Sequence, residues 1–130
     1  MRLVIGSDHA GWSLKKVVAD HVRQLGHELI DVGSFDENPV DFPDIARKVA
    51  AAIISGRAER GLMVCGTGVG AAIGANKMKG IRAAVCHDVH SAHQSVEHDD
   101  VNVMCIGAQI VGPWLAKDLI AAYLAAKFST

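Results

Sequence analysis

The sequence has few aromatic residues, no excess of charge of either sign and no long apolar run. Aromatic residues make up 5% of the 130 positions and the formal net charge is −1, so the chain lacks the basic field that binds a phosphate backbone. No apolar stretch approaches the roughly 20 residues that a membrane span needs, and the first residues do not resemble a secretory signal. We therefore expect no nucleic-acid partner, no membrane partner and a cytoplasmic location.

Cysteine is also scarce, and its three occurrences lie far apart, at Cys65, Cys86 and Cys105. An odd number of separated thiols, each within or after an apolar run, fits a reducing compartment better than disulfides or a zinc ribbon. We expect Cys86 and Cys105 to be inert, buried strand residues.

Apolar residues are abundant, at 50% of the chain, and they follow a repeated strand–helix rhythm. Apolar runs predict strands at 2–7, 28–32, 61–65, 82–86 and 103–106. Helical spacing predicts helices at 14–25, 43–55, 69–78, 89–97 and 113–127. Continuous apolar strands alternating with helices predict an α/β fold, a three-layer αβα sandwich around a five-stranded parallel sheet. A chain of this length fits one domain, residues 1–130.

Reactive side chains follow three of the predicted strands. Asp8 and His9 follow the first, Cys65 ends the third, and Cys86-His87-Asp88 ends the fourth. Ligands of open parallel sheets bind beyond the carboxyl ends of the strands, an edge called here the carboxyl rim. We therefore expect all three clusters on this rim. Asp8 could simply cap the following helix, but a binding role for Asp8 and His9 is favoured because they share the rim with Cys65.

The segment Cys65-Gly-Thr-Gly-Val-Gly is the most specific motif. Its glycine loop, Gly66–Gly70, has three glycines at alternate positions between a strand and a helix. Such a loop can aim successive amides at one point near the positive end of the helix dipole, which predicts an anion site. A thiol at the same helix N-terminus is a good base or nucleophile. The alternative is that Cys65 is another inert, buried cysteine.

The same loop half-matches a dinucleotide-binding fingerprint, because Gly66, Gly68 and Ala71 are followed by Asp88 at the next strand end. We disfavour nucleotide binding because the match lies at the third strand and so small a chain leaves no room for a hydride acceptor. A non-catalytic, flavodoxin-like module that binds a small ligand remains an alternative.

The predicted helix at 89–97 is rich in histidine. His90, His93 and Glu97 share one face and could hold a metal, but a solvated polar face explains them equally well, and we expect no metal. His98 and Asp99 follow this helix, which returns them to the edge opposite Cys65. They could join the Cys65 site only from a second subunit, so the sequence predicts a dimer and leaves a tetramer open.

Six segments carry further specific motifs, in this order along the chain: Gly6-Ser7-Asp8-His9-Ala10-Gly11, Asp41-Phe42-Pro43-Asp44, Cys65-Gly66-Thr67-Gly68-Val69-Gly70, Ala75-Asn76-Lys77, Gly80-Ile81-Arg82-Ala83 and His98-Asp99-Asp100-Val101-Asn102-Val103. Together they cover nearly the whole chain. They resemble the type B ribose-5-phosphate isomerase family, which includes the galactose-6-phosphate isomerase subunits.

This resemblance implies a Rossmann-like homodimer with shared active sites that interconverts ribose 5-phosphate and ribulose 5-phosphate without metal or cofactor. By the resemblance, Cys65 moves the proton between C1 and C2 and Thr67 assists proton transfer at the sugar oxygens. His98 of the partner subunit opens the furanose ring. The implied substrate-binding residues are Asp8 at the hydroxyls, His9 near the phosphate, Asp99 near the ring, and the enediolate-holding amides of Gly66, Gly68, Val69 and Gly70.

The chain departs from the family pattern at several points. Members commonly have arginine where this chain has Gln109 and further arginines in a C-terminal tail, whereas this sequence ends at Lys127-Phe128-Ser129-Thr130. Phe42 replaces a frequent tyrosine, and Asp99 a frequent asparagine. The same chemistry on another sugar phosphate, such as a hexose 6-phosphate, or on an unphosphorylated sugar is therefore kept as an alternative.

Overall fold

Strands and helices alternate along the whole chain. The computed structural model describes residues 1–35 and 38–129, which form five strands and five helices. The strands are β1 (Arg2–Ser7), β2 (Glu28–Asp31), β3 (Arg60–Cys65), β4 (Ala83–Val85) and β5 (Val103–Gly107). The helices are α1 (Trp12–Gln24), α2 (Phe42–Ile54), α3 (Val69–Asn76), α4 (Val89–Glu97) and α5 (Pro113–Ala125). Each agrees with its predicted range to within two residues at either end.

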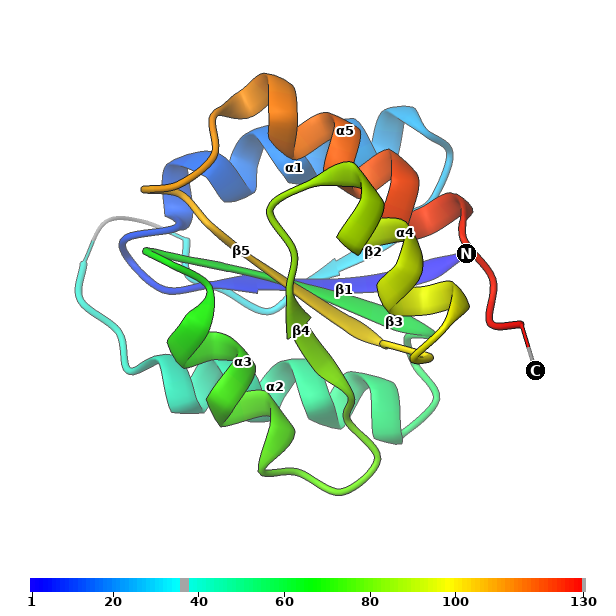
Figure 1. The fold of residues 1–130 in the computed structure, drawn as a ribbon. Helices are drawn as coiled ribbons and strands as arrows, with labels where there is room; N and C mark the ends of the chain where they lie inside the picture. Colours follow the sequence, from blue (N-terminus) through cyan, green and yellow to red (C-terminus); the bar gives the residue numbers. More distant parts are fainter. Residues whose placement is uncertain (36–37, 130) are drawn as a thin grey trace.

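The described strands form one sheet in the order β2-β1-β3-β5-β4, and every neighbouring pair is parallel (Figure 1). The predicted parallel sheet is confirmed. In this register Ser7 pairs with Val64, and Cys65 pairs with Gly107. The carboxyl ends of the three central strands, β1, β3 and β5, therefore lie next to one another.

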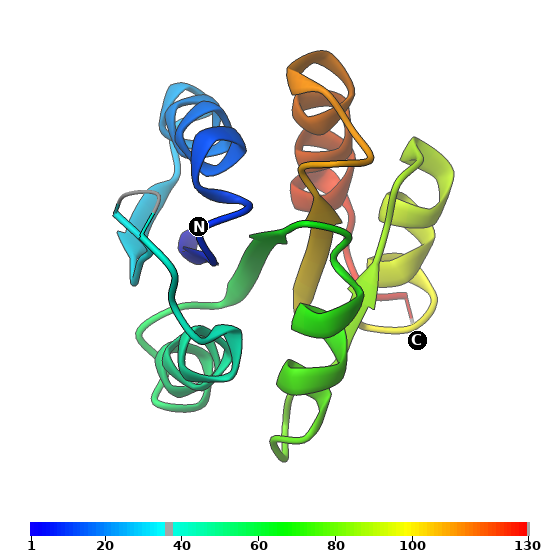
Figure 2. The same cartoon turned by 90° about the vertical axis from the view of Figure 1, so that its left-hand side faces the viewer.

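Helices cover both faces of the sheet, as the predicted αβα sandwich requires (Figure 2). Successive strand residues point to opposite faces, so Leu62 and Val64 pack with α1, α4 and α5, whereas Met63 and Cys65 pack with α2 and α3. Apart from Arg2 and Arg60, the residues of β1, β3 and β5 are buried on both faces, which explains why these strands read as continuous apolar runs. Cys65 thus ends its strand on the face that α2 and α3 cover. Within the described residues, no helix combines the length and the apolar character needed to cross a bilayer.

Two helices, α3 and α5, end two residues earlier than their apolar patterns predict, and a long-range side-chain contact lies at each of these ends. The side chain of Asn76 at the end of α3 bonds both backbone groups of Ala83, with distances of 2.8 and 2.7 Å. The guanidinium of Arg60 donates to the carbonyl oxygens of Tyr123 and Ala126, each at 2.7 Å, at the end of α5. The Arg60 contacts satisfy carbonyl groups at the C-terminal end of α5 that would otherwise need a further helical turn.

Candidate active site

The carboxyl rim gathers the predicted side chains of the central strands. Asp8 and His9 follow β1, Cys65 ends β3, and the loop from Gly107 follows β5, so these three segments adjoin. Cys86-His87-Asp88 follows β4, beyond β5, and so lies farther from Cys65 than the β1 cluster. The predicted placement of all three clusters on one edge is confirmed.

The glycine loop is folded against the end of β5. Gly68 has a φ of +84°, a left-handed conformation that glycine adopts without strain, and it serves as the N-cap of α3. The loop carbonyls of Cys65 and Gly66 accept hydrogen bonds from Ala108 and Gln109, at 2.7 and 3.0 Å. These contacts hold the turn against the segment that follows β5.

The thiol of Cys65 lies beneath this loop, and the residue is buried. The residue is 7% exposed, and its Sγ accepts a hydrogen bond from the Gly68 amide at 3.0 Å. A directed amide donor at the helix N-terminus is a geometry suited to a sulfur that carries negative charge. Cys65 thus lies at the N-terminus of α3 with a directed amide donor on its sulfur.

Cys86 and Cys105 have different surroundings. Both are buried and free, at 2% and 0% exposure. Burial raises the pKa of each thiol, and the interaction of Cys105 with the other two cysteines raises its pKa further. The prediction that these two cysteines are buried strand residues is confirmed for Cys105, whereas Cys86 lies one residue beyond β4.

Two amides of the glycine loop donate within the loop itself. Gly68 donates to Cys65 Sγ, and Val69 donates to the hydroxyl oxygen of Thr67 at 3.3 Å. Thr67 is exposed, so its side chain stands at the surface of the rim. An anion bound by these two amides would have to replace the thiol and the hydroxyl as their acceptors.

Asp8 and His9 are each held by a backbone amide. Asp8 Oδ1 accepts from Gly11 at 2.9 Å, so part of the expected capping role is present, although the N-cap of α1 is Gly11 itself. His9 is exposed, and its Nδ1 accepts from the Val40 amide at 3.4 Å. A neutral His9 ring in this arrangement carries its proton on Nε2, the nitrogen left to face a ligand.

Three side chains at the rim have positions that the sequence patterns did not assign. His87 Nε2 accepts from the Gly107 amide at 2.9 Å, so a ring nitrogen completes the ladder where β4 has ended. The side chain of Gln109 lies over Gly66, since a Cβ added there would meet its amide oxygen at 3.2 Å. The Phe42 ring covers Gly70 and Gly74 in the same way, at 3.3 and 3.5 Å. Of these three positions, only that of His87 had a signal in the sequence, because His87 follows the end of a predicted strand.

His98 and Asp99 lie away from Cys65, as predicted. They follow α4 and precede β5, which places them at the amino edge of the sheet. Both are exposed, at 79% and 70% of their side chains, and His98 Nδ1 lies 3.4 Å from Asp99 Oδ1. One chain alone therefore does not bring them to the carboxyl rim.

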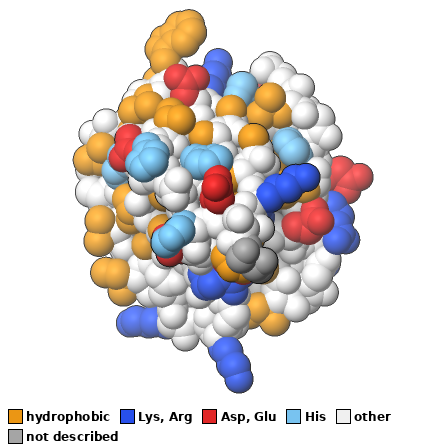
Figure 3. Space-filling model, turned by 45° about the vertical axis from the view of Figure 1, so that its right-hand side comes forward, with side chains coloured by type: hydrophobic (Ala, Val, Ile, Leu, Met, Phe, Trp, Pro, Cys, Tyr) orange, Lys and Arg blue, Asp and Glu red, His pale blue; other side chains and the backbone are white. Residues whose placement is uncertain are grey.

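The polar face of α4 carries histidines next to carboxylates. His93 Nε2 pairs with Glu97 Oε2 one turn later. Among residues 1–35 and 38–129, no group of three or more His, Cys, Asp or Glu side chains is arranged to hold a metal ion. Figure 3 shows the side of the molecule that carries α4, where histidines, carboxylates and hydrophobic side chains are interspersed.

A parallel αβα sandwich with a thiol, a glycine loop and an Asp-His pair on its carboxyl rim defines a class: small α/β enzymes that act on a small molecule. Residues 3–130 match the family described as Ribose/Galactose Isomerase, and the chain belongs to this family. The family resemblance read from the sequence, and with it the assignment of the chain as an isomerase, is confirmed.

Individual relatives span almost all of the chain. It is 41% identical over 127 residues to ribose-5-phosphate isomerase B of Escherichia coli, covering 98% of this chain and 85% of the relative. It is 43% identical over 131 residues to D-erythrulose-4-phosphate isomerase of Pectobacterium atrosepticum, with coverage of 98% and 85%. Among solved structures, ribose-5-phosphate isomerase B of Clostridium thermocellum superposes with a TM-score of 0.96 at 46% identity, covering 98% and 86% of the two chains.

Proposed function

We propose that this protein is an aldose–ketose isomerase that interconverts ribose 5-phosphate and ribulose 5-phosphate through an enediolate. The observation that carries the proposal is the Cys65 thiol under the Gly68 amide, at the rim of the sheet and beside Asp8 and His9. The substrate is taken from the names of the Escherichia coli and Clostridium thermocellum relatives. A location in the cytoplasm, whose reducing conditions keep the three thiols free, belongs to the same proposal.

In this proposal Cys65 is the base. Its thiolate takes the proton from C2 of the open-chain aldose, which leaves an enediolate across C1 and C2. Return of the proton to C1 gives the ketose, while the hydroxyl of Thr67 relays the second proton from O2 to O1. The glycine-loop amides stabilise the charge that develops on oxygen, and loss of one such donor typically costs about 10²–10³ in rate. No cofactor takes part, because the electrons stay within the sugar.

Asp8 and His9 bind the remainder of the sugar. The carboxylate of Asp8 accepts hydrogen bonds from sugar hydroxyls, and its bond to Gly11 fixes its orientation. His9 presents Nε2–H toward the phosphate while Val40 holds Nδ1. Each of these groups is placed by backbone contacts, so the site is largely formed before the sugar arrives.

The site is completed by a second copy of the chain. His98 of the partner subunit supplies the acid–base group that opens the furanose ring, with the partner's Asp99 beside it. The surface around β4 suits such a dimer: β4 is an edge strand, and Val69, Ile73 and Val89 on the adjoining helices are 51%, 57% and 46% exposed. Exposed apolar side chains beside a strand edge are typical of a surface that another chain covers.

A second candidate keeps the chemistry and changes the sugar. The neutral Gln109 side chain lies over Gly66, and the Pectobacterium atrosepticum relative is named for a tetrulose phosphate. A neutral amide holds a phosphate dianion more weakly than a cation would. This candidate therefore differs from the first in the length of the sugar or in its charged group, and not in the role of Cys65.

Kinetics on a panel of sugars in D2O would test both candidates. The panel comprises ribose 5-phosphate, erythrulose 4-phosphate, a hexose 6-phosphate and free ribose. We expect the highest kcat/KM for ribose 5-phosphate, with deuterium entering the product at C1 or C2. A higher kcat/KM for another sugar, with the same deuterium entry, would favour the second candidate. Absence of turnover on every sugar of the panel would contradict the isomerase proposal.

A further inference from the structure

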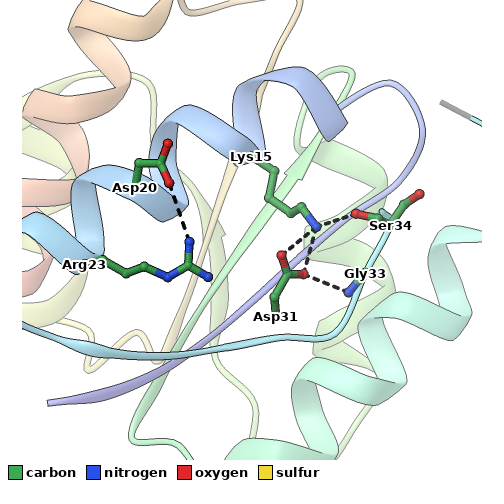
Figure 4. Close-up of polar contacts among 6 residues, drawn as sticks. All are labelled: Lys15, Asp20, Arg23, Asp31, Gly33 and Ser34. Carbon is green, nitrogen blue, oxygen red and sulfur yellow. Dashed lines mark hydrogen bonds and ion pairs between the residues drawn. The ribbon is translucent and has the colours of Figure 1, made fainter. Parts of the chain in front are cut away.

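Lys15 on α1 is a buried cation outside the proposed catalytic set. Of the charged side chains that the structure describes, it is the one that is buried, at 2% exposure. Its ammonium group donates to Asp31 Oδ1 and Oδ2, at 2.7 and 2.9 Å, and to the carbonyl oxygen of Ser34 (Figure 4). The Phe35 ring lies 4.9 Å from Nζ. An ammonium has three donors, so this set of acceptors satisfies it fully.

The acceptors of Lys15 hold the turn that follows β2 against the end of β1. Asp31 Oδ1 also accepts from the Gly33 amide at 3.0 Å, which closes the turn. Gly33 in turn accepts from the Ser7 amide at 2.6 Å, and Ser34 donates to the Ser7 carbonyl at 2.7 Å. The side chain of Lys15 is therefore connected, through one turn, to the residue that precedes Asp8.

The backbone of Lys15 is connected to the other end of the same loop. Its amide donates to the Gly11 carbonyl at 2.9 Å, and the Gly11 amide donates to Asp8 Oδ1. Gly11 itself is pressed against β3, because a Cβ there would lie 2.1 Å from the carbonyl oxygen of Val64. This helical bond does not depend on the side chain, so the ammonium group of Lys15 acts on the Ser7 end of the segment Asp8–Gly11.

We propose that Lys15, together with Asp31, is a positioning pair that fixes Asp8 and His9 relative to Cys65. The inference rests on the proposed function, since it assigns Asp8 and His9 to the substrate. An ion pair whose cation is buried is weak evidence for a role in stability alone, because an apolar pair of similar size often serves as well. Here the charged pair joins three backbone segments at the rim, which an apolar pair could not do.

Four variants test the pair. Lys15→Met removes the cation, Asp31→Asn removes the carboxylate charge at constant size, and Lys15→Arg keeps the cation. Asp20→Asn is the matched control, because Asp20 also lies on α1 and pairs with Arg23 at 3.6 Å on the surface (Figure 4). Two readouts are taken at a temperature where circular dichroism shows each variant folded. They are kcat and KM, and the ¹⁵N chemical shifts of the His9 ring, which report its tautomer.

We expect Lys15→Met to shift the His9 ring toward a mixture of tautomers and to lower kcat/KM at least about tenfold, since small misplacements of binding groups are costly. Asp31→Asn changes both readouts in the same direction but less. Lys15→Arg restores the His9 spectrum and most of the activity, and Asp20→Asn matches the wild type.

The proposal would be overturned if Lys15→Met kept the wild-type His9 chemical shifts and the wild-type kcat/KM and differed from the wild type only in a lower Tm. If Lys15→Met does not fold, unchanged readouts in Asp31→Asn would overturn it equally. The His9 shifts are recorded without substrate, so they decide the role of Lys15 even if the chain isomerises none of the sugars tried.

Discussion

Gly107 at the end of β5 lies so close to Thr67 that a Cβ on Gly107 would be 2.7 Å from the Thr67 Cα. The same Cβ would also be 2.7 Å from the carbonyl oxygen of Gly66. Real Cβ atoms do not approach backbone this closely, so glycine is required at this position for steric reasons. The end of β5 therefore helps to determine the orientation of the glycine-loop amides, although β5 contributes no proposed catalytic group.

Replacement of Gly107 by alanine should misalign the glycine loop. We expect kcat/KM to fall about 10²-fold or more, because the amides would no longer meet the enediolate oxygen. Gly112→Ala is the control, since a Cβ at Gly112 meets nothing within 4 Å. Steady-state kinetics on the folded variants provide the measurement, and wild-type kcat/KM in Gly107→Ala would contradict the assigned role of the loop.

A shared active site predicts complementation between two impaired variants. Homodimers of Cys65→Ala and of His98→Ala each have two damaged sites, whereas a mixed dimer has one intact site. Random exchange of subunits should restore about a quarter of the wild-type activity. The measurement is the activity of an equimolar mixture, with two affinity tags to verify that mixed dimers form. Mixed dimers without regained activity would show that His98 does not serve the Cys65 of another subunit.

Asp88 should make the stability of α4 depend on pH. Its Oδ1 accepts from the Ser91 amide at 2.7 Å at the N-cap of the helix. This bond, followed by the interaction with the Ser91 side chain, lowers the pKa of the carboxyl from its usual 3.8. A lowered folded-state pKa stabilises the protein above the unfolded value, and this stabilisation is lost as the pH falls through the folded value.

Asp88→Asn keeps the cap and removes the charge. We therefore expect the wild type to have a higher Tm than Asp88→Asn at pH 7, and the difference to shrink as the pH falls below 3.8. Thermal unfolding of both proteins across this range is the measurement. A Tm difference that stayed constant down to the lowest pH would mean that the Asp88 charge contributes nothing.

The sequence predicted the fold well because local patterns determine most of it. Apolar runs marked each strand, and helical spacing placed the ends of each helix to within two residues. The errors lie where distant residues intervene. Arg60 ends α5 from a position that is 63 residues from Tyr123 in the chain, and no local pattern contains that contact.

The candidate site was predictable in its location and less so in its contacts. Parallel topology alone placed Asp8, His9 and Cys65 on one rim. The contact of His87 with Gly107 depends on where β4 stops relative to β5, and that is set by tertiary packing. Tertiary packing also decides the contact of the Gly68 amide. The glycine pattern predicted that this amide points at an anion, whereas in the structure it donates to Cys65 Sγ.

The central claim is that the Cys65 sulfur moves the proton, and a comparison of two alanine variants tests it most directly. Cys86→Ala is the matched control, because burial raises the pKa of the Cys86 thiol and the residue has no proposed role. The measurement is deuterium entry from D2O into the product, together with kcat. We predict that Cys65→Ala remains folded, and that its kcat and its rate of deuterium entry fall by several orders of magnitude. Cys86→Ala should keep the wild-type values of kcat and deuterium entry. Turnover and deuterium entry near wild-type rates in Cys65→Ala would contradict the account.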